Sequence, residues 1–310
     1  MAKVAVTGGA GFIGSNLVRL LLDSGYQVKV LDNFSTGLAS NLHDLKVDIV
    51  DLDICNFESL RQNLRGIDVI VHLAARGSVP RSLKDPRKTL EVNTFGTLNL
   101  LEVARENGAH LIFSSSSSVY GANTDLPKHE EMWLRPLSPY AASKLAAEGL
   151  VSSYSTSFGT KVTPLRFFNV FGPWQRHDHE YAAVLPKWIW KAMHGEAIEL
   201  QGDGEQTRDF TYIETVCEVI LAAIEHEICT SEIINLAYGN NISLNQIIKL
   251  LKSEFPNLEV LNAPTRIGDI RNSQNNPERL KRLFPNVKPK PFEESLSATI
   301  SWMQKLESKS

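Results

Sequence analysis

A run of glycines between an apolar strand pattern and a helix pattern constrains this chain more than any other feature of its sequence. Val4 to Val6 have the apolar character of a buried strand, and Thr7 to Gly14 (TGGAGFIG) follow at once, before the helix pattern. In such a turn Gly8 permits the tight bend, Gly11 lets the backbone approach a phosphate, and Gly14 lets the helix pack on the strand. The helix N-terminus offers unpaired N–H groups to an anion. The turn therefore predicts binding of a dinucleotide pyrophosphate.

An aspartate at the end of the next strand pattern indicates which dinucleotide is bound. Asp32 stands 18 positions after Gly14, where a carboxylate can accept hydrogen bonds from both hydroxyls of the adenine ribose. The same carboxylate would repel a 2′-phosphate, so we expect NAD rather than NADP. Asp53 and Ile54 follow the third strand pattern and are candidates for contact with the adenine, with a solvated loop as the alternative for Asp53.

The arrangement of patterns along the chain predicts an α/β fold. The first half alternates short apolar runs with amphipathic segments, which is typical of a doubly wound parallel Rossmann sheet covered by helices. Beyond Phe168, turn signals, aromatic residues and prolines predict a smaller α+β C-terminal lobe. We expect residues 1–168 to form the NAD-binding domain, with a return at 210–238. Residues 169–209 and 239–310 would then form the substrate lobe.

Composition excludes several classes of partner. A formal net charge of −3 provides no broad positive field, so we expect no nucleic acid. No stretch of about 18 apolar residues and no signal pattern occurs, so we expect a cytoplasmic protein without a membrane partner. Cys55, Cys217 and Cys229 lack CxxC spacing, which favours reduced thiols over a disulfide framework or a zinc site. We interpret His177 to Glu180 (HDHE) as a solvated loop and expect no metal.

A tyrosine and a lysine supply a candidate general base. Tyr140 and Lys144 lie four residues apart on one face of a predicted helix, and an adjacent ammonium lowers the pKa of a phenol. Five consecutive serines, Ser114 to Ser118, follow the buried strand pattern Leu111 to Phe113. Ligands of open α/β sheets bind at such carboxyl ends. A serine hydroxyl there can hydrogen-bond a substrate oxygen, whereas other members of the run satisfy their own backbone.

Together these motifs resemble the extended short-chain dehydrogenase/reductase family of NAD-dependent nucleotide-sugar epimerases and dehydratases. The resemblance covers nearly the whole chain and rests on Thr7 to Gly14, Ser114 to Gly121, Tyr140 to Lys144, Arg166 to Asn169 and Arg208 to Phe210. It is closest to the branch that epimerises UDP-N-acetylglucosamine and UDP-glucose at C4 for polysaccharide biosynthesis, through Gly77 to Ser82, Tyr181 to Trp188 and Gly268 to Gln274. It implies Ser116, Tyr140 and Lys144 as the catalytic residues.

The resemblance also implies which residues contact the ligands. NAD would be held by Gly8, Gly11, Phe12, Ile13, Gly14, Asp32, Asn33, Ser35, Thr36, Gly37, Asp53, Ile54, Leu73, Ala74, Ala75, Asn93, Ser114, Tyr140, Lys144 and Phe168. The UDP-sugar would be contacted by Ser78, Ser116, Asn169, Ala183, Val184, Lys187, Trp188, Arg208, Arg266, Asp269 and Ser273. The two arginines would bind the pyrophosphate, because guanidinium forks suit phosphate oxygens. A core position is the alternative for Trp188. The resemblance further implies a homodimer through the helix patterns Thr94 to Glu106 and Tyr140 to Tyr154.

The residues after Ser116 favour one of the reactions that members of the family catalyse. Dehydratases of the family place Asp-Glu directly after the catalytic residue, and UDP-glucuronate decarboxylases place a Glu two positions after it, whereas this chain has Ser117 and Ser118. Eliminating water needs a further acid and base, so we expect 4-epimerisation through a transient 4-keto sugar. Ser273 stands where relatives specific for unacetylated hexoses have a tyrosine, which favours N-acetylated sugars. The alternatives are a dehydratase and a noncatalytic NAD-binding sensor.

Three positions depart from the family pattern. Arg76 stands where relatives often carry Gln or an apolar residue, and it would either reach a phosphate or alter the sugar pocket. Arg176 stands where relatives that epimerise UDP-glucuronate use an arginine for the carboxylate, so a uronate 4-epimerase is a further alternative. Asn275-Asn276 replaces the usual Ala-Asp, and the sequence suggests no role for this change.

Overall fold

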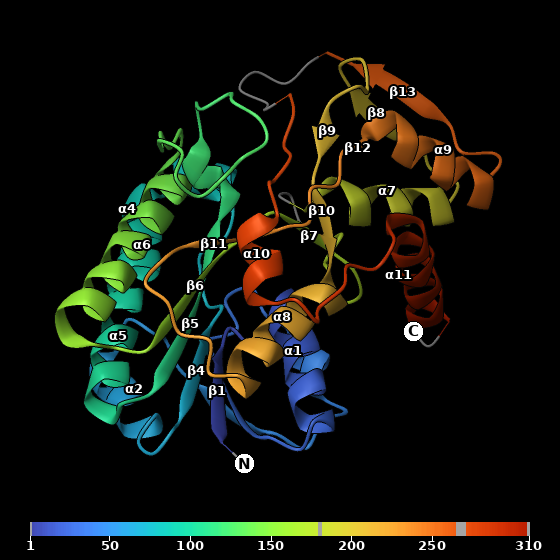
Figure 1. The fold of residues 1–310 in the computed structure, drawn as a ribbon. Coiled ribbons are helices and arrows are strands. Elements are labelled where there is room, and N and C mark those ends of the chain that lie inside the picture. The colour runs from blue at the N-terminus through green and yellow to red at the C-terminus, as the bar shows by residue number, and fades with distance from the viewer. Residues whose placement is uncertain (1, 179–181, 265–270, 309–310) are drawn as a thin grey trace.

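The computed structural model of the chain describes residues 2–178, 182–264 and 271–308. Its centre is a seven-stranded sheet in the order β11-β6-β5-β4-β1-β2-β3, in which every neighbouring pair is parallel. Figure 1 shows α2, α5 and α6 on one face of this sheet and α1 and α8 on the other. The expected doubly wound Rossmann fold is therefore confirmed.

The elements have the following bounds. The strands are β1 (Lys3–Thr7), β2 (Gln27–Asp32), β3 (Asp48–Asp51), β4 (Val69–His72), β5 (His110–Ser116), β6 (Val162–Phe167), β7 (Asn169–Phe171), β8 (Ile198–Gln201), β9 (Thr207–Arg208), β10 (Phe210–Tyr212), β11 (Ile234–Leu236), β12 (Ile242–Ser243) and β13 (Val260–Ala263). The α-helices are α1 (Phe12–Asp23), α2 (Phe57–Asn63), α3 (Val79–Lys84), α4 (Pro86–Leu90), α5 (Gly96–Asn107), α6 (Pro139–Phe158), α7 (Val184–Met193), α8 (Ile213–Glu225), α9 (Leu244–Glu254), α10 (Glu278–Leu283) and α11 (Phe292–Glu307). Short helical turns occur at η1 (Ala39–Leu42), η2 (Glu91–Phe95) and η3 (Ser117–Tyr120).

Strand β1 shows why the sequence forms a sheet that is covered on both faces. Val4 and Val6 belong to the core cluster beneath α1 and α8, whereas Ala5, between them, belongs to the cluster beneath α5 and α6. All six residues of β6 are also buried. A strand buried on both faces needs apolar residues at successive positions, which is the pattern in the sequence.

The strand order reverses beside β1, and this reversal places the ligand site. Thr7, the last residue of β1, lies opposite Leu31 of β2 on one side and His72 of β4 on the other. The chain runs outward from β1 to β3 in one direction and from β4 to β11 in the other. A crevice opens at the carboxyl ends of the strands at such a point, and ligands of α/β sheets bind there.

The remaining segments build a second part, drawn at the upper right of Figure 1. It contains the parallel pair β8 and β13 and the antiparallel pair β9 and β12, with α7, α9 and α11. Between its two segments the chain returns to the sheet, where Ile234 of β11 lies opposite Leu165 of β6 and α8 packs against α1. Within the described residues, no helix combines the length and the apolar character that crossing a membrane requires.

The helix that carries Tyr140 has well-defined ends. The side chain of Ser138 caps α6 by accepting the N–H of Ala141, and Pro139 occupies the first turn. The helix ends before Gly159, whose φ of 66° is the left-handed conformation that favours glycine. These caps fix where α6 begins relative to β5, and therefore which of its residues face the carboxyl ends of the strands.

Candidate active site

The glycine turn after β1 is as compact as its sequence predicts. Gly8 has a φ of +72°, and a Cβ there would lie 2.7 Å from the backbone nitrogen of Ala74. A Cβ on Gly14 would lie 2.2 Å from the carbonyl oxygen of Gly8. Helix α1 therefore begins close against β1, and Gly11, Phe12, Ile13 and Gly14 line a cavity of about 720 Å³ at its N-terminus. A pyrophosphate fits a cradle of this kind, because backbone N–H groups and the helix dipole face it.

Asp32 lies at the carboxyl end of β2, inside the crevice. One carboxylate oxygen accepts the N–H of Ala10 at 2.9 Å and the other accepts the N–H of Phe34 at 2.9 Å, which fixes the orientation of the side chain. Burial raises the pKa of Asp32, and these two backbone hydrogen bonds lower it by less than burial raises it. A Cβ on Gly37 would lie 2.9 Å from its Oδ2, so this glycine leaves space beside the carboxylate.

A cavity of about 470 Å³ opens beside Asp32. Its lining includes most of the residues expected around the adenosine: Gly8, Gly11, Asp32, Asn33, Ser35, Thr36, Asp53, Ile54, Leu73, Ala74 and Ala75. Four cationic residues that the sequence analysis did not assign to the cofactor also line it, Arg76, Arg81, Lys84 and Lys88. Arg81 and Lys84 lie three residues apart on α3, whereas Lys88 lies on α4, so one helical spacing in the sequence does not predict all three.

Tyr140, Lys144 and Ser116 meet where β5 ends. Lys144 is 3% exposed, and its ammonium donates a hydrogen bond to the carbonyl oxygen of Ser114 at 2.7 Å. Tyr140 and Ser116 line the same cavity, and a hydrogen bond from the Ser116 hydroxyl is the one effect that opposes the rise in the pKa of Tyr140. Ser118 donates its hydroxyl to the Oγ of Ser116 at 2.9 Å. Of the five serines, Ser116 is therefore the one that faces the phenol.

One electrostatic expectation is wrong for this structure. Lys144 was expected to lower the pKa of Tyr140, but burial raises the pKa of Tyr140 while only the hydrogen bond from Ser116 opposes this. The ammonium of Lys144 is directed at the carbonyl of Ser114 instead, and burial lowers its own pKa to about 8. The loss of hydration therefore sets the direction of the shift in the pKa of Tyr140, and Lys144 contributes no lowering to it.

The cavity at the glycine turn also reaches the catalytic group and the second lobe. Besides the turn it is lined by Ser78, Ser114, Ser116, Tyr140, Lys144, Phe168, Asn169 and Ala183. It shares Phe168, Asn169 and Ala183 with a cavity of about 780 Å³ in the second lobe. The crevice is therefore a continuous trough from Asp32, past Tyr140, into the second lobe.

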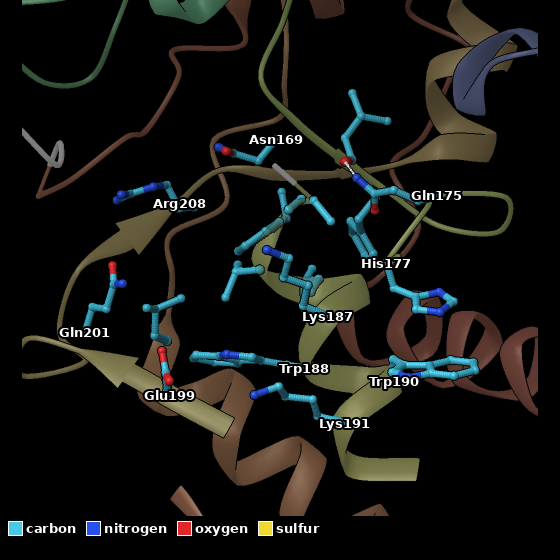
Figure 2. Close-up of a pocket in the computed structure, with 18 of the residues that line it drawn as sticks. Asn169, Gln175, His177, Lys187, Trp188, Trp190, Lys191, Glu199, Gln201 and Arg208 are labelled. Carbon is cyan, nitrogen blue, oxygen red and sulfur yellow. Dashed lines mark hydrogen bonds between the residues drawn. The ribbon is translucent and has the colours of Figure 1, made fainter. Parts of the chain in front are cut away.

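The cavity in the second lobe combines apolar walls with charged groups of both signs, namely Lys187, Lys191 and Arg208 and the carboxylates of Glu196 and Glu199. Figure 2 shows Lys187 of α7 and Arg208 of β9 on its walls, with Trp188 below them. Asn169 and Val184 also line it. Trp188 is only 4% exposed, so it serves both the core and the wall.

A smaller cavity of about 250 Å³ lies between the serine run and the second lobe. It is lined by Ser116, Ser117, Ser118, Tyr120, Gly121, Asn123, Lys128, Phe168, Asn169, Arg208, Asn272 and Ser273. Hydroxyl, amide and cationic groups supply its polar surface. Among the described residues no aspartate or glutamate lines it.

Several candidate residues lie elsewhere. Asn93 does not line these cavities: its side chain accepts the N–H of Arg76 at 2.7 Å and donates to the Oγ of Ser143 at 2.9 Å. Asn93 therefore links the segment after β4 to α6 and stabilises both. Gly37 likewise packs behind Asp32. Arg266 and Asp269 lie outside the described residues.

The two unusual arginines face the cofactor side of the trough. Arg76 lies 3.3 Å from a carboxylate oxygen of Asp85. Arg176 pairs with Asp178 at 2.8 Å and donates to the carbonyl oxygen of Thr36 at 3.3 Å. Arg176 is absent from the lining of the small cavity beside Ser116. It nevertheless lines the cavity of about 720 Å³ together with Ser116 and Tyr140, so its expected contact with a sugar carboxylate stays a prediction.

The first two residues of the HDHE segment, His177 and Asp178, each contact a different neighbour. His177 stacks on Trp190 with ring centroids 3.8 Å apart, as Figure 2 shows, and Asp178 pairs with Arg176. His179 and Glu180 lie outside the described residues.

The fold and the trough together define a dinucleotide-dependent enzyme of the short-chain dehydrogenase/reductase class. Residues 4–237 match the model of the NAD dependent epimerase/dehydratase family, and the chain belongs to this family. Family membership confirms the expected resemblance and the expectation of NAD as cofactor.

Individual relatives differ in reaction. The chain is 35% identical to the structure of a UDP-N-acetylglucosamine 4-epimerase from Methanobrevibacter ruminantium M1, with a TM-score of 0.93 and coverage of 98% of this chain and 99% of that one. It is 34% identical to a UDP-glucose 4-epimerase from Thermotoga maritima, with the same TM-score and coverage. A UDP-glucuronic acid decarboxylase 1 from Xenopus tropicalis is 32% identical over 98% of this chain and 72% of its own length. Because relatives of similar identity act on different sugars, membership of the family does not identify the substrate of this chain.

Proposed function

We propose that the protein catalyses NAD-dependent 4-epimerisation of a UDP-hexose, with UDP-N-acetylglucosamine and its galacto epimer as the principal pair and UDP-glucose as a further substrate. The observation that carries the proposal is the small cavity beside Ser116, whose described lining holds hydroxyl, amide and cationic groups but no carboxylate. Removing water from the sugar would require an additional acid and base there. Exchange at C4 requires only the phenol and its partners.

Each residue has a defined task in this reaction. Tyr140 takes the proton of the 4-hydroxyl group, and Ser116, hydrogen-bonded to it, shares that proton. Lys144 holds the end of β5 through Ser114 and places a positive charge beside the developing phenolate. A bound NAD would supply the hydride acceptor, and later the hydride donor, that exchange at C4 through a transient 4-keto sugar requires.

The residues fit NAD and a diphosphate ligand at the two ends of the trough. The glycine turn and Asp32 would hold the cofactor, with residues 1–168 and the return at 210–238 as its domain. Arg208, Lys187 and Asn169 would hold the UDP pyrophosphate, because cations and amide donors suit phosphate oxygens. Residues 169–209 and 239–310 would then form the substrate lobe.

The proposal is tested by NMR of purified protein incubated separately with UDP-N-acetylglucosamine, UDP-glucose and UDP-glucuronate. We expect each accepted sugar to reach a mixture with its C4 epimer, without loss of water or carbon dioxide. Appearance of a dehydrated or decarboxylated product would contradict the proposal. Bound NAD without turnover of any sugar would instead identify a noncatalytic NAD-binding sensor.

A tyrosine at position 273 is expected to exclude the acetylated sugar. Ser273 lines the small cavity with Ser116, and its N–H donates to the carbonyl oxygen of Thr207 at 3.1 Å, which fixes its backbone. A phenol ring there would occupy the space of the acetamido group. In Ser273→Tyr we expect turnover of UDP-N-acetylglucosamine to fall about 10- to 100-fold relative to UDP-glucose.

The control is Ser273→Ala, which keeps the cavity open and should keep the preference between the two sugars. Equal loss of activity on both sugars in Ser273→Tyr would show that position 273 does not select the substituent.

We also propose that the protein is a homodimer formed through α5 and α6. These helices pack side by side, and two exposed phenylalanines lie at their ends: Phe95, the last residue of η2 directly before α5, is 61% exposed, and Phe158, the last residue of α6, is 58% exposed. Symmetric pairing of such a face is the commonest way to bury it. Light scattering should give twice the chain mass of 34.5 kDa, and Phe95→Glu should shift the protein toward monomer. A wild-type monomer at micromolar concentration would contradict this.

A further inference from the structure

Three residues of α6 face the end of β5, and the third of them, Glu148, has no assigned role in the reaction. Tyr140, Lys144 and Glu148 recur every four residues and therefore lie on one face of the helix. Tyr140 contacts Ser116 and Lys144 contacts the carbonyl of Ser114. Glu148 accepts the hydroxyl of Ser115, the residue between these two, at 2.5 Å. Three successive residues of β5 are thus each held by one residue of α6.

Glu148 is fixed in turn by an arginine of the adjacent strand. Arg166 of β6 lies opposite Ser115 in the sheet. Its Nε donates to Oε1 of Glu148 at 2.8 Å and its Nη2 donates to Oε2 at 2.7 Å, with both side chains at most 4% exposed. This bidentate geometry is the strong form of the pair. Glu148 therefore joins α6, β5 and β6, and its charge compensates that of Arg166.

The same arginine begins a buried polar path to the second lobe. Arg166 donates to the hydroxyl of Tyr120 at 3.0 Å, and that hydroxyl is 2.9 Å from Oδ1 of Asn235. Asn235 donates to Oδ1 of Asn275 at 2.9 Å, and the N–H of Asn275 donates to Asp209 at 2.9 Å.

The path ends beside two candidate substrate contacts. Asp209 follows Arg208, and Asn275 lies two residues after Ser273. The path therefore also gives a structural role to Asn275.

We propose that Glu148 is a positioning residue for the reaction: it holds α6 and the end of β5 in the register that brings Tyr140 to Ser116, and it neutralises Arg166 behind the catalytic pair. This role of Glu148 rests on the proposed function, because epimerisation is the activity that the experiment measures. Glu148 does not itself line the trough, and it acts on the lining only through Ser115, whose hydroxyl it accepts. Buried ion pairs contribute little to net stability, so a purely structural role must be distinguished by experiment.

The first variant is Glu148→Gln, which keeps the shape of the side chain and removes its charge. The positive charge of Arg166 is then buried without a compensating carboxylate. Because this charge favours the deprotonated form of nearby groups, their pKa values should fall. The titratable groups around Lys144 are Tyr140 and Glu148 on its own helix, Arg166 through Glu148, and His72 of β4. Burial lowers the pKa of His72 to about 3, and the charge of Lys144 adds to this lowering. His72 is therefore neutral throughout the working range. We expect kcat to fall about tenfold and the pH profile of kcat to shift to lower pH, with KM for the UDP-sugar changed less than kcat.

The second variant, Glu148→Leu with Arg166→Met, removes both charges together and should retain the fold. Its net charge matches the wild type, so the pH profile should return to its original position. Because Ser115 has lost its acceptor, kcat should remain low. If the pair were only structural, this double variant would recover wild-type kcat, and that result would overturn the proposal.

A matched control and an independent readout complete the test. Glu106→Gln breaks the exposed pair between Glu106 and Arg61 and should leave kcat and the pH profile unchanged. The ionisation of Tyr140 can also be followed by phenolate absorbance, with the Tyr140→Phe protein subtracted as a blank. A shift to lower pH in Glu148→Gln supports the proposal even if none of the tested sugars is turned over. An unshifted titration contradicts it.

Discussion

Replacing Tyr140 with phenylalanine is expected to abolish epimerisation while leaving the fold and the binding of UDP-sugar largely intact. Only the ionisable hydroxyl is removed, and the aromatic ring still fills its place on α6. General base catalysis contributes about 10²- to 10⁴-fold, so kcat should fall by at least that lower bound. The loss should be measured as product formation by NMR, with KM or direct binding of the UDP-sugar determined in parallel.

The matched control is Tyr154→Phe, which removes a hydroxyl from the same helix. Tyr154 hydrogen-bonds to Glu102 on α5, away from the trough. This variant should keep wild-type kcat. Substantial turnover in Tyr140→Phe would show that another group takes the proton of the sugar.

Adding one methyl group to Gly14 is expected to destabilise the protein and to release NAD. The new Cβ would lie 2.2 Å from the carbonyl oxygen of Gly8 and 2.6 Å from the Cα of Gly9, so backbone must move and α1 must separate from β1. Overpacking of this kind costs about 3 kcal/mol of unfolding free energy, or more where backbone is displaced. Chemical denaturation and the amount of NAD released from denatured protein provide the two measurements.

Gly11→Ala separates the two effects. Its Cβ would meet only the carbonyl oxygen of Gly8, at 3.2 Å, and the φ of Gly11 is −78°, which any residue adopts. The fold should therefore remain stable, whereas NAD content should fall because the backbone next to the pyrophosphate is obstructed. Full NAD content in Gly11→Ala would show that the phosphates do not approach this glycine.

The parts of the site that are local in sequence could be predicted from it. The glycine turn, Asp32 and the pair Tyr140 and Lys144 each depend on spacing within one or two elements, and parallel β-strands bring their carboxyl ends to one edge. The alternation of strand and helix patterns predicted a parallel sheet covered by helices, and the helix and strand patterns at 210–238 predicted the return of the chain to it. These features need no knowledge of which distant side chains meet.

The parts that depend on distant partners could not be predicted. Glu148 and Arg166 are 18 residues apart and meet only because α6 packs on β5 and β6. Arg176 pairs with Asp178 and donates to the carbonyl oxygen of Thr36, which lies 140 positions away, and its sequence position does not reveal the second contact. The pKa of Tyr140 is another such case, because it depends on burial, which helical spacing does not reveal.

The late arrival of β11 has a consequence for how the molecule is synthesised. β6, buried along its whole length, has β11 as its outer neighbour, and β11 begins only at Ile234, after the first segment of the second lobe. While the ribosome is still translating residues 169–233, β6 is an unpaired sheet edge that exposes Val162, Leu165 and Phe167, and such an edge is a template for aggregation. A fragment cut at residue 168 would keep that edge permanently. The dinucleotide half can therefore close its sheet only when the chain extends through Leu236.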